Sequence, residues 1–387
     1  MEDKDYPMPS TPATAGGAVD YTDKQVVRNL QLSLENIVNV SEAAFAKISH
    51  LKEKELLLAF GNTGCGKSTM ISSLVFGPDK LEMKAVPEVR MVRGVERTYY
   101  NRIIDQREDF KGWLAGQNFD GLFEIGHSKA ESKTFIPHFY KPPDQNMIYS
   151  DIAGLMDTAG DLIEYVNCFM NKKIFNQAKK IKFIVPITKA QMKEVRGGPI
   201  VQQIEIILNL CSRSYSDVIK SIQPVITKVE QHPSSEEIYD DDDIDVLKYN
   251  LKEIFDNYLV NTRREMAEEL DQGKSSDGAP TGSLEDRQKM EDQLKELEKF
   301  LFEFSSKAVI FDPLDRPIPT PDQMELFEIA EPWSTKRDDL LAKIVDLQGT
   351  QGIYLNVPLS NKLHQKLMKM LDRSRDLCLE EANNYIV

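Results

Sequence analysis

One ten-residue stretch, FGNTGCGKST at residues 60–69, constrains the fold of this chain more than any other feature. It matches the pattern G-x-x-x-x-G-K-[ST], also called Walker A, at every specified position. The apolar run ELLLAF (55–60) precedes it and predicts a buried strand, whereas STMISSLVFG (68–77) follows it and predicts a helix. Strand, glycine loop and helix in this order are the context in which the pattern forms a phosphate-binding loop.

The residue types of this stretch predict that it holds a phosphate chain. Glycines let the backbone curl until successive N–H groups point at anionic oxygens, and the helix that starts near Lys67 adds the positive end of its dipole. We expect Lys67 to reach the β- and γ-phosphates, where it also acts catalytically, and the Ser68 hydroxyl to bind Mg²⁺. The expected nucleotide-binding residues of the stretch are Gly61, Asn62, Thr63, Gly64, Cys65, Gly66, Lys67, Ser68 and Thr69.

Further apolar runs alternate with helical patterns along the chain. The runs at 134–140 and 146–151 predict a strand pair around the turn KPPDQ, and three more runs predict strands at 181–188, 222–228 and 307–312. Helical patterns lie between the strands at 161–180, about 200–220 and 247–270. This alternation predicts an α/β fold with a mostly parallel, doubly wound sheet. Together with the glycine pattern at 60–69, it resembles a three-layer P-loop NTPase domain.

The remaining segments predict additions to this domain. Residues 1–21, rich in Pro, Ala, Gly and Thr, are expected to be a disordered tail. An amphipathic helix at 22–53 and a C-terminal helix at 351–387 flank the P-loop domain, which spans 54–350 and contains a helical or disordered insertion at about 231–305.

A second expected insertion, of mixed polar and aromatic composition, covers residues 78–131. Within the insertion at 231–305, the stretch 284–304 predicts an amphipathic helix because Met290, Leu294, Leu297, Leu301 and Phe304 recur at helical spacing. Helices of this kind pack against their own domain or bind a partner, and the pattern alone leaves both interpretations open.

The bulk composition restricts the partners and the compartment. The 387 residues carry a net charge of −14, which argues against a long nucleic-acid footprint but not against one nucleotide in a pocket. Four cysteines without a C-x-x-C pair indicate free thiols in a reducing compartment. The N-terminus lacks the basic and apolar blocks of a signal peptide. The sequence contains no run of about 18 apolar residues, so it predicts no transmembrane segment. We therefore expect a cytoplasmic protein that does not bind nucleic acid.

With these residues in view, the chain resembles the P-loop GTPases, which carry D-x-x-G at the end of the third strand. Asp151-Ile152-Ala153-Gly154 follows the run NMIYS and is similar to that element. In the family the aspartate holds Mg²⁺ through a water and the glycine amide senses the γ-phosphate, so the resemblance implies these roles for Asp151 and Gly154. Asp157-Thr158-Ala159-Gly160 is a second candidate, and we prefer Asp151 because it ends the apolar run directly.

The P-loop GTPases also carry a switch threonine just before the second strand. Thr134 opens the second predicted strand. The resemblance implies that its hydroxyl and carbonyl reach Mg²⁺ and the γ-phosphate, which makes Thr134 a metal ligand and a catalytic residue. Ser132 is the alternative, and an ordinary threonine at a strand start is the structural interpretation of the same residue.

A third element, [NT]-K-x-D after the fifth strand, recognises guanine in the family. Thr227-Lys228-Val229-Glu230 follows the run PVI and is similar to it, with Glu230 in place of the aspartate. The resemblance implies that Glu230 accepts hydrogen bonds from the base and that the Lys228 stem packs on the ring, with Thr227 in the same site. The extra methylene of Glu230 weakens the guanine preference, so GTP or GDP is expected as the ligand and ATP is the less favoured alternative.

Leu155 stands where Ras-like enzymes place the glutamine that orients water. Leucine cannot hydrogen-bond water, so the resemblance is closer to septin-like and immunity-associated GTPases and implies slow hydrolysis. Those families often work as dimers across the nucleotide face, which suggests a homodimer there or a protein partner on the helical extensions. The sequence predicts a slow Mg²⁺-dependent GTPase acting as a switch or assembly module. The alternatives are a nucleotide-binding scaffold with negligible hydrolysis and a P-loop ATPase.

Overall fold

The computed structural model describes residues 54–92, 95–117, 122–123, 125, 138–143, 145–152, 174, 177–194, 197–210, 214–229, 244–272, 284–311 and 332–350. The predicted terminal helices at 22–53 and 351–387 lie outside these residues, as does the tail at 1–21. Most of the predicted helix at 161–180 also lies outside them.

A six-stranded sheet forms the centre of the fold, with strand order β4-β5-β1-β6-β7-β8. Neighbouring strands are parallel from β5 to β8, and only the edge strand β4 runs antiparallel. The strands are β1 (Glu55–Ala59), β4 (His138–Tyr140), β5 (Met147–Asp151), β6 (Lys180–Thr188), β7 (Ile222–Thr227) and β8 (Val309–Ile310). The molecule is therefore an α/β protein with a mostly parallel sheet, as the sequence predicts.

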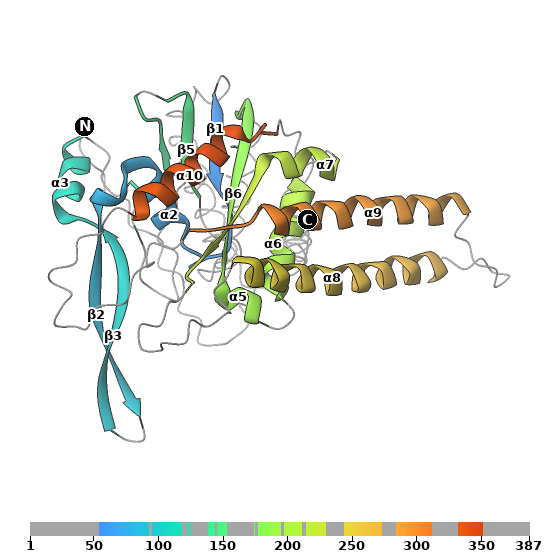
Figure 1. The fold of residues 1–387 in the computed structure, drawn as a ribbon, viewed down its shortest axis with the longest axis horizontal. Coiled ribbons are helices and arrows are strands. Elements are labelled where there is room, and N and C mark those ends of the chain that lie inside the picture. Colours follow the sequence, from blue (N-terminus) through green and yellow to red (C-terminus); the bar gives the residue numbers. More distant parts are fainter. Residues whose placement is uncertain are drawn as a thin grey trace, which may run out of the picture.

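Both faces of the sheet are covered by helices. The helices are α2 (Lys67–Phe76), α3 (Glu108–Gly116), α5 (Lys189–Lys193), α6 (Gly198–Leu210), α7 (Tyr215–Val218), α8 (Ile244–Gln272), α9 (Leu284–Lys307) and α10 (Pro332–Asp346). Side chains of α2, α3 and α10 pack against one face, and those of α6, α7, α8 and α9 pack against the other. This arrangement makes three layers (Figure 1).

The first strand shows why two cores form. Leu56, Leu58 and Phe60 contribute to the core under α6, α8 and α9, whereas Leu57 and Ala59 contribute to the core under α2. Successive side chains of a strand point to opposite faces, so a strand buried on both sides reads as a continuous apolar run. That is the physical reason for the run ELLLAF before the glycine loop.

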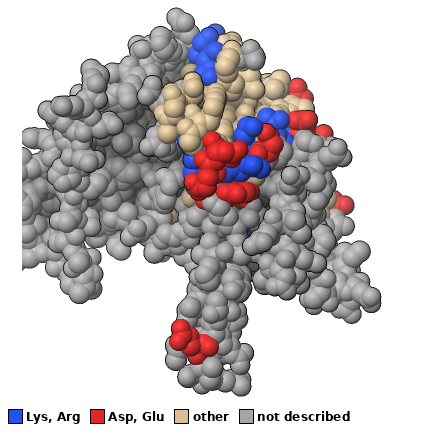
Figure 2. Space-filling model, turned by 90° about the vertical axis from the view of Figure 1, so that its left-hand side faces the viewer, with Lys and Arg blue, Asp and Glu red and all other residues tan. Residues whose placement is uncertain are grey.

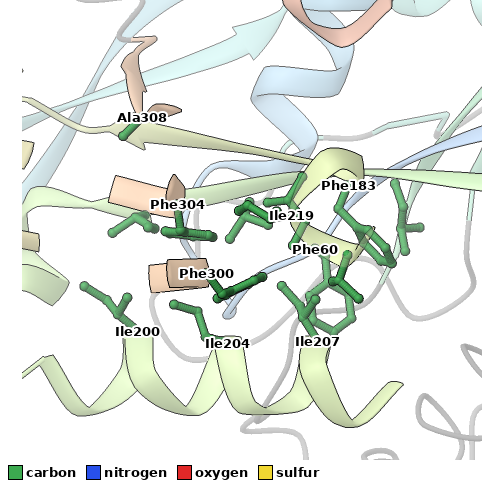
Figure 3. Close-up of a cluster of buried hydrophobic side chains, with 14 of the residues drawn as sticks. Phe60, Phe183, Ile200, Ile204, Ile207, Ile219, Phe300, Phe304 and Ala308 are labelled. Atoms are coloured by element: carbon green, nitrogen blue, oxygen red, sulfur yellow. The ribbon is translucent and has the colours of Figure 1, made fainter. Parts of the chain in front are cut away.

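The larger core is formed by α6 and α9 against the sheet. Figure 3 shows Ile200, Ile204 and Ile207 of α6 pointing toward Phe60, which directly follows β1, and Phe300 of α9. These α6 residues are spaced by four and three, as one face of a helix requires. Helix α6 is thereby held directly against the strand that leads into the glycine loop.

A long hairpin occupies much of the segment that we expected only as a mixed insertion at 78–131. Strands β2 (Leu81–Val92) and β3 (Val95–Gln106) pair antiparallel with Val92 opposite Val95. They form a separate two-stranded sheet that extends away from the main sheet (Figure 1). The short 3-10 helix η2 (Pro78–Lys80) connects this hairpin to α2.

Helices α8 and α9 lie side by side and extend beyond the sheet (Figure 1). The predicted amphipathic helix at 284–304 lies within α9, where Leu294, Leu297, Leu301 and Phe304 are buried. Leu251 and Phe255 of α8 belong to the same core. One part of the helix pair is therefore integral to the domain core.

Two predicted boundaries differ from the structure. The pattern at about 200–220 is divided between α6 and α7, followed by the 3-10 turn η4 (Ile219–Ser221). The predicted strand at 307–312 is only Val309–Ile310, because α9 continues through Lys307. Among the described helices, none is both long and apolar enough to cross a membrane.

The surface beside α3 carries charges of both signs. On this side of the molecule Figure 2 shows acidic and basic side chains intermixed in one patch. At α3, Lys111 Nζ lies 3.0 Å from Asp105 Oδ2 and 3.1 Å from Glu108 Oε1. The Lys111–Glu108 pair is exposed and contributes little to stability, whereas Asp105 is buried.

Candidate functional site

The candidate site lies at the carboxyl edge of the parallel strands. Ala59 at the end of β1 pairs in register with Asp151 at the end of β5, and Thr188 at the end of β6 pairs with Thr227 at the end of β7. The glycine loop (residues 61–66) leaves β1 at the same edge. In open α/β sheets, ligands bind outside the carboxyl ends of the strands, so this edge is the first place to seek a site.

The backbone of the glycine loop has the shape that its glycines permit. Gly64 and Gly66 have φ angles of 79° and 93°, in the left-handed region that other residues rarely adopt. Gly61 is required for a different reason, since a Cβ there would lie 2.9 Å from Cys65 Sγ and 3.0 Å from Gln203 Nε2. The loop is thus both sharply curved and closely packed.

Lys67 lies inside this curve. Its side chain is buried, with the residue only 7% exposed. The Nζ ammonium donates hydrogen bonds of 3.1 Å to the Gly61 carbonyl and 3.0 Å to the Asn62 carbonyl. A buried ammonium needs such partners, and a third N–H donor remains for an anionic ligand at the loop.

Ser68 and Asp151 come together although they are 83 residues apart in the chain. The Ser68 hydroxyl donates a hydrogen bond of 2.6 Å to Asp151 Oδ2, and Asp151 is completely buried. A hydroxyl and a carboxylate are hard oxygen ligands of the type that Mg²⁺ takes, usually together with waters and phosphate oxygens. Both residues are predicted metal ligands, and their geometry fits that role.

The turn at Thr227–Lys228, which the resemblance assigns to recognition of the nucleotide base, is hydrogen-bonded directly to the glycine loop. The Thr227 hydroxyl donates a hydrogen bond of 2.9 Å to the carbonyl of Cys65. Burial raises the pKa of the Cys65 thiol, although the neighbouring Lys67 ammonium acts in the opposite direction. The Cys65 thiol therefore packs inside the loop, where burial favours its neutral form.

Lys228 follows Thr227 in an unusual backbone conformation. Its φ angle of 55° is in the left-handed region, and its side chain is exposed while Val229 is buried in the core. A non-glycine residue held in this region is uncommon and stored strain of this kind clusters at functional sites. The turn presents the lysine at the same edge as the glycine loop.

Six residues that the sequence singles out lie outside the described residues. They are Thr134, its alternative Ser132, Gly154, Leu155, Asp157 and Glu230. Their predicted roles stay predictions. The structure brings together the remaining predicted residues: the glycine loop with Lys67, Ser68 and Thr69, then Asp151, Thr227 and Lys228.

Helix α6 contributes a contact that the sequence analysis did not single out. The Gln203 side chain is buried and its Nε2 donates a hydrogen bond of 2.8 Å to the Phe60 carbonyl, immediately before the loop. The signal was a glutamine inside the apolar stripe of Ile200, Ile204 and Ile207. On the loop itself, Asn62 Oδ1 and Thr63 Oγ1 are buried without a hydrogen-bond partner among the described residues.

Two hollows on the surface lie elsewhere. One of about 390 Å³ is lined by residues of α5 and α8, and one of about 350 Å³ by residues of α8 and α9. Neither is lined by a residue of the glycine loop. Within the part of the chain that the structure describes, no group of three or more His, Cys, Asp or Glu residues could hold a metal ion.

Comparisons with known proteins add no family to this description. No protein-family model matches the chain, and no curated protein matches it either.

Proposed function

We propose that this protein binds a nucleoside triphosphate with Mg²⁺, prefers GTP to ATP, and hydrolyses it slowly as a switch or assembly module. One observation carries the proposal. The Ser68 hydroxyl and the Asp151 carboxylate, each predicted on its own as a metal-side ligand, are joined by a 2.6 Å hydrogen bond beside the buried Lys67. The resemblance to P-loop GTPases implies such a pair, and chance would rarely bring these two residues together.

The topology supports the same proposal. In chain order, Asp151 ends the third strand of the six-stranded sheet and Thr227 ends the fifth. These are the positions at which P-loop GTPases carry D-x-x-G and [NT]-K-x-D. Both residues lie at the edge where the glycine loop begins, so one ligand could contact the loop and both strand ends.

Each described residue has a defined task in the proposed site. The loop N–H groups and the start of α2 bind the phosphates, and Lys67 neutralises the β- and γ-phosphate charge. Ser68 and Asp151 would hold a bound Mg²⁺ at this edge. When bound, Mg²⁺ supplies charge neutralisation to the phosphates. Leu155 lacks a group that orients water, which is why turnover is expected to be slow.

The proposed recognition of the guanine base depends on the turn after β7. The Lys228 side chain is exposed at this edge, where its stem can pack on a planar ring, and Thr227 ties the turn to Cys65 at 2.9 Å. Glu230 is assigned to the guanine amino groups by resemblance alone. A homodimer across the nucleotide face, or a protein partner on the helical extensions, completes the proposal as a switch or assembly module.

Single-turnover hydrolysis tests the proposal. With purified protein in excess over radiolabelled GTP and Mg²⁺, we expect slow release of phosphate, and Ser68→Ala should remove the Mg²⁺ dependence of GTP binding. Ser72→Ala is the matched control, since Ser72 is a buried serine of the same helix whose hydroxyl bonds to the Phe123 carbonyl at 3.1 Å.

The outcomes distinguish the slow GTPase from the nucleotide-binding scaffold and from the P-loop ATPase. GTP binding without any phosphate release over hours would favour the nucleotide-binding scaffold. Hydrolysis of ATP in preference to GTP would favour the P-loop ATPase. Absence of any nucleotide binding, with the protein folded, would contradict the proposal.

A further inference from the structure

Gln203 is a polar residue within a buried helical stripe. Among the α6 side chains that the structure describes, Ile200, Gln203, Ile204 and Ile207 are buried, at the i, i+3, i+4, i+7 spacing of one helix face. The glutamine is only 1% exposed, although the exposed face of the helix would accept it without cost. A polar side chain kept in an apolar stripe needs a specific partner, because burying an unpaired amide is unfavourable.

The partner is the backbone at which the glycine loop begins. Gln203 Nε2 donates a 2.8 Å hydrogen bond to the Phe60 carbonyl, while the Phe60 N–H is bonded to the Ile184 carbonyl of β6 at 2.8 Å. The Phe60 peptide is thus held by the sheet through its N–H and by α6 through its carbonyl. The same Nε2 would lie 3.0 Å from a Cβ on Gly61.

A second contact joins α6 to the loop. Asn62 Nδ2 donates a longer hydrogen bond, 3.4 Å, to the Pro199 carbonyl at the start of α6. The amide oxygens of Gln203 and Asn62 are buried and have no hydrogen-bond partner among the described residues. Each amide therefore holds backbone through its donor side, Gln203 at the Phe60 carbonyl and Asn62 at the Pro199 carbonyl.

We propose that Gln203 is a positioning residue of the glycine loop, through which α6 sets the direction in which the loop leaves β1. The part of the proposal that concerns a bound ligand rests on the proposed nucleotide function. The part that concerns the loop itself does not, because it can be measured on the protein without any nucleotide.

Cys65 reports on the loop in that measurement. It is 1% exposed and lies against Gly61, so a thiol reagent reaches it only when the loop opens. The experiment measures the rate at which iodoacetamide modifies Cys65, identified by peptide mass spectrometry, in the nucleotide-free protein. Gln203→Met removes the hydrogen bond at nearly constant volume, and Gln203→Asn shortens the side chain if the first variant does not fold.

Gln223→Met is the matched control. Gln223 of β7 is also buried, and its Nε2 donates a 2.8 Å hydrogen bond to a backbone carbonyl outside the loop, that of Lys307 at the end of α9. Loss of either amide should lower the melting temperature by a similar amount. Only the Gln203 variant should label Cys65 faster, by about tenfold, because one hydrogen bond holding the loop is lost.

A nucleotide arm separates this proposal from the proposed function. We expect Gln203→Met to weaken GTP binding by about tenfold and Gln223→Met to change it by no more than about twofold. If the wild type binds no nucleotide, the proposed function fails and the Cys65 rates still decide the role of Gln203. Equal Cys65 rates in the Gln203 and Gln223 variants would overturn the proposal.

Discussion

The glycine loop and the α8–α9 pair belong to the same domain but are held by different interactions. A few directed hydrogen bonds hold the loop: those of Lys67 to two carbonyls, of Thr227 to Cys65, and of Gln203 to Phe60. Non-directional burial holds the helix pair, with apolar side chains repeated along each helix. The loop therefore depends on the identity of single atoms, whereas the helices depend on volume and pattern.

This difference predicts how each region responds to substitution. In the loop, removing one donor leaves buried carbonyls unpaired and changes the shape offered to a ligand. In the helix pair, a substitution changes stability in proportion to the apolar contact that it removes, and a site at the opposite edge of the core need not respond. Substitutions in the loop should thus change mainly ligand binding, and substitutions in the helix pair should change mainly the free energy of unfolding.

Lys67→Ala should have the largest effect. We expect GTP affinity to fall by about 1,000-fold, because the charge-assisted phosphate contact of the third N–H donor (~1.5–3 kcal/mol) is lost and the buried Gly61 carbonyl loses its donor at a further cost of ~1–3 kcal/mol. Isothermal titration calorimetry with Mg²⁺ present measures the affinity, and circular dichroism checks that the variant is folded. Wild-type affinity in this variant would remove the glycine loop from the binding site.

Lys182→Met is the control for that experiment. Lys182 is also buried, but its Nζ bonds to Glu55 at 3.1 Å and to the Val345 carbonyl at 3.0 Å, away from the loop. We expect its loss to lower the free energy of unfolding by ~1–3 kcal/mol and to leave GTP affinity within about twofold. A buried lysine that affects stability alone would sharpen the contrast with Lys67.

The next largest effect is expected in α9. Phe304 is fully buried and Phe302 is 60% exposed, so the two phenylalanines form a matched pair two residues apart. Phe304→Ala should lower the free energy of unfolding by about 3–5 kcal/mol, and Phe302→Ala should change it by no more than about 0.5 kcal/mol. Urea unfolding measures both. Similar losses for the two variants would mean that the outer face of α9 is covered in solution.

Glu230→Asp is expected to have the smallest effect, and it concerns base recognition. The shorter carboxylate restores the spacing of the [NT]-K-x-D element, so the ratio of GTP affinity to ATP affinity should rise by about tenfold. Competition between the two nucleotides measures this ratio directly. An unchanged ratio would separate Glu230 from the base site while leaving the phosphate side of the proposal intact.

The sequence predicted the sheet and the loop edge because their signals are local. Apolar runs of strand length identify the six strands, and the glycine pattern requires a strand before it and a helix after it. The antiparallel pairing of β4 with β5 around KPPDQ also agrees with the prediction. Short, strongly patterned segments of this kind carry their structure in their own residues.

The β2–β3 hairpin and the role of Gln203 escaped prediction for two reasons. The hairpin strands are rich in β-branched and aromatic residues, and Arg93-Gly94 lies between them, but Pro87 and several charges conceal the alternation. Gln203 depends on a partner 143 residues away in the chain, which no local pattern reveals. Its only sequence signal was a polar residue within a buried stripe.

The most direct test of the central claim is a calorimetric competition of GTP, GDP and ATP for the wild-type protein with Mg²⁺ present. We predict that GTP and GDP bind and that each displaces ATP. Binding of ATP equal to or tighter than GTP would contradict the assignment of the turn at Thr227–Lys228 to guanine. Absence of binding by all three nucleotides would contradict the claim that this glycine loop holds phosphate.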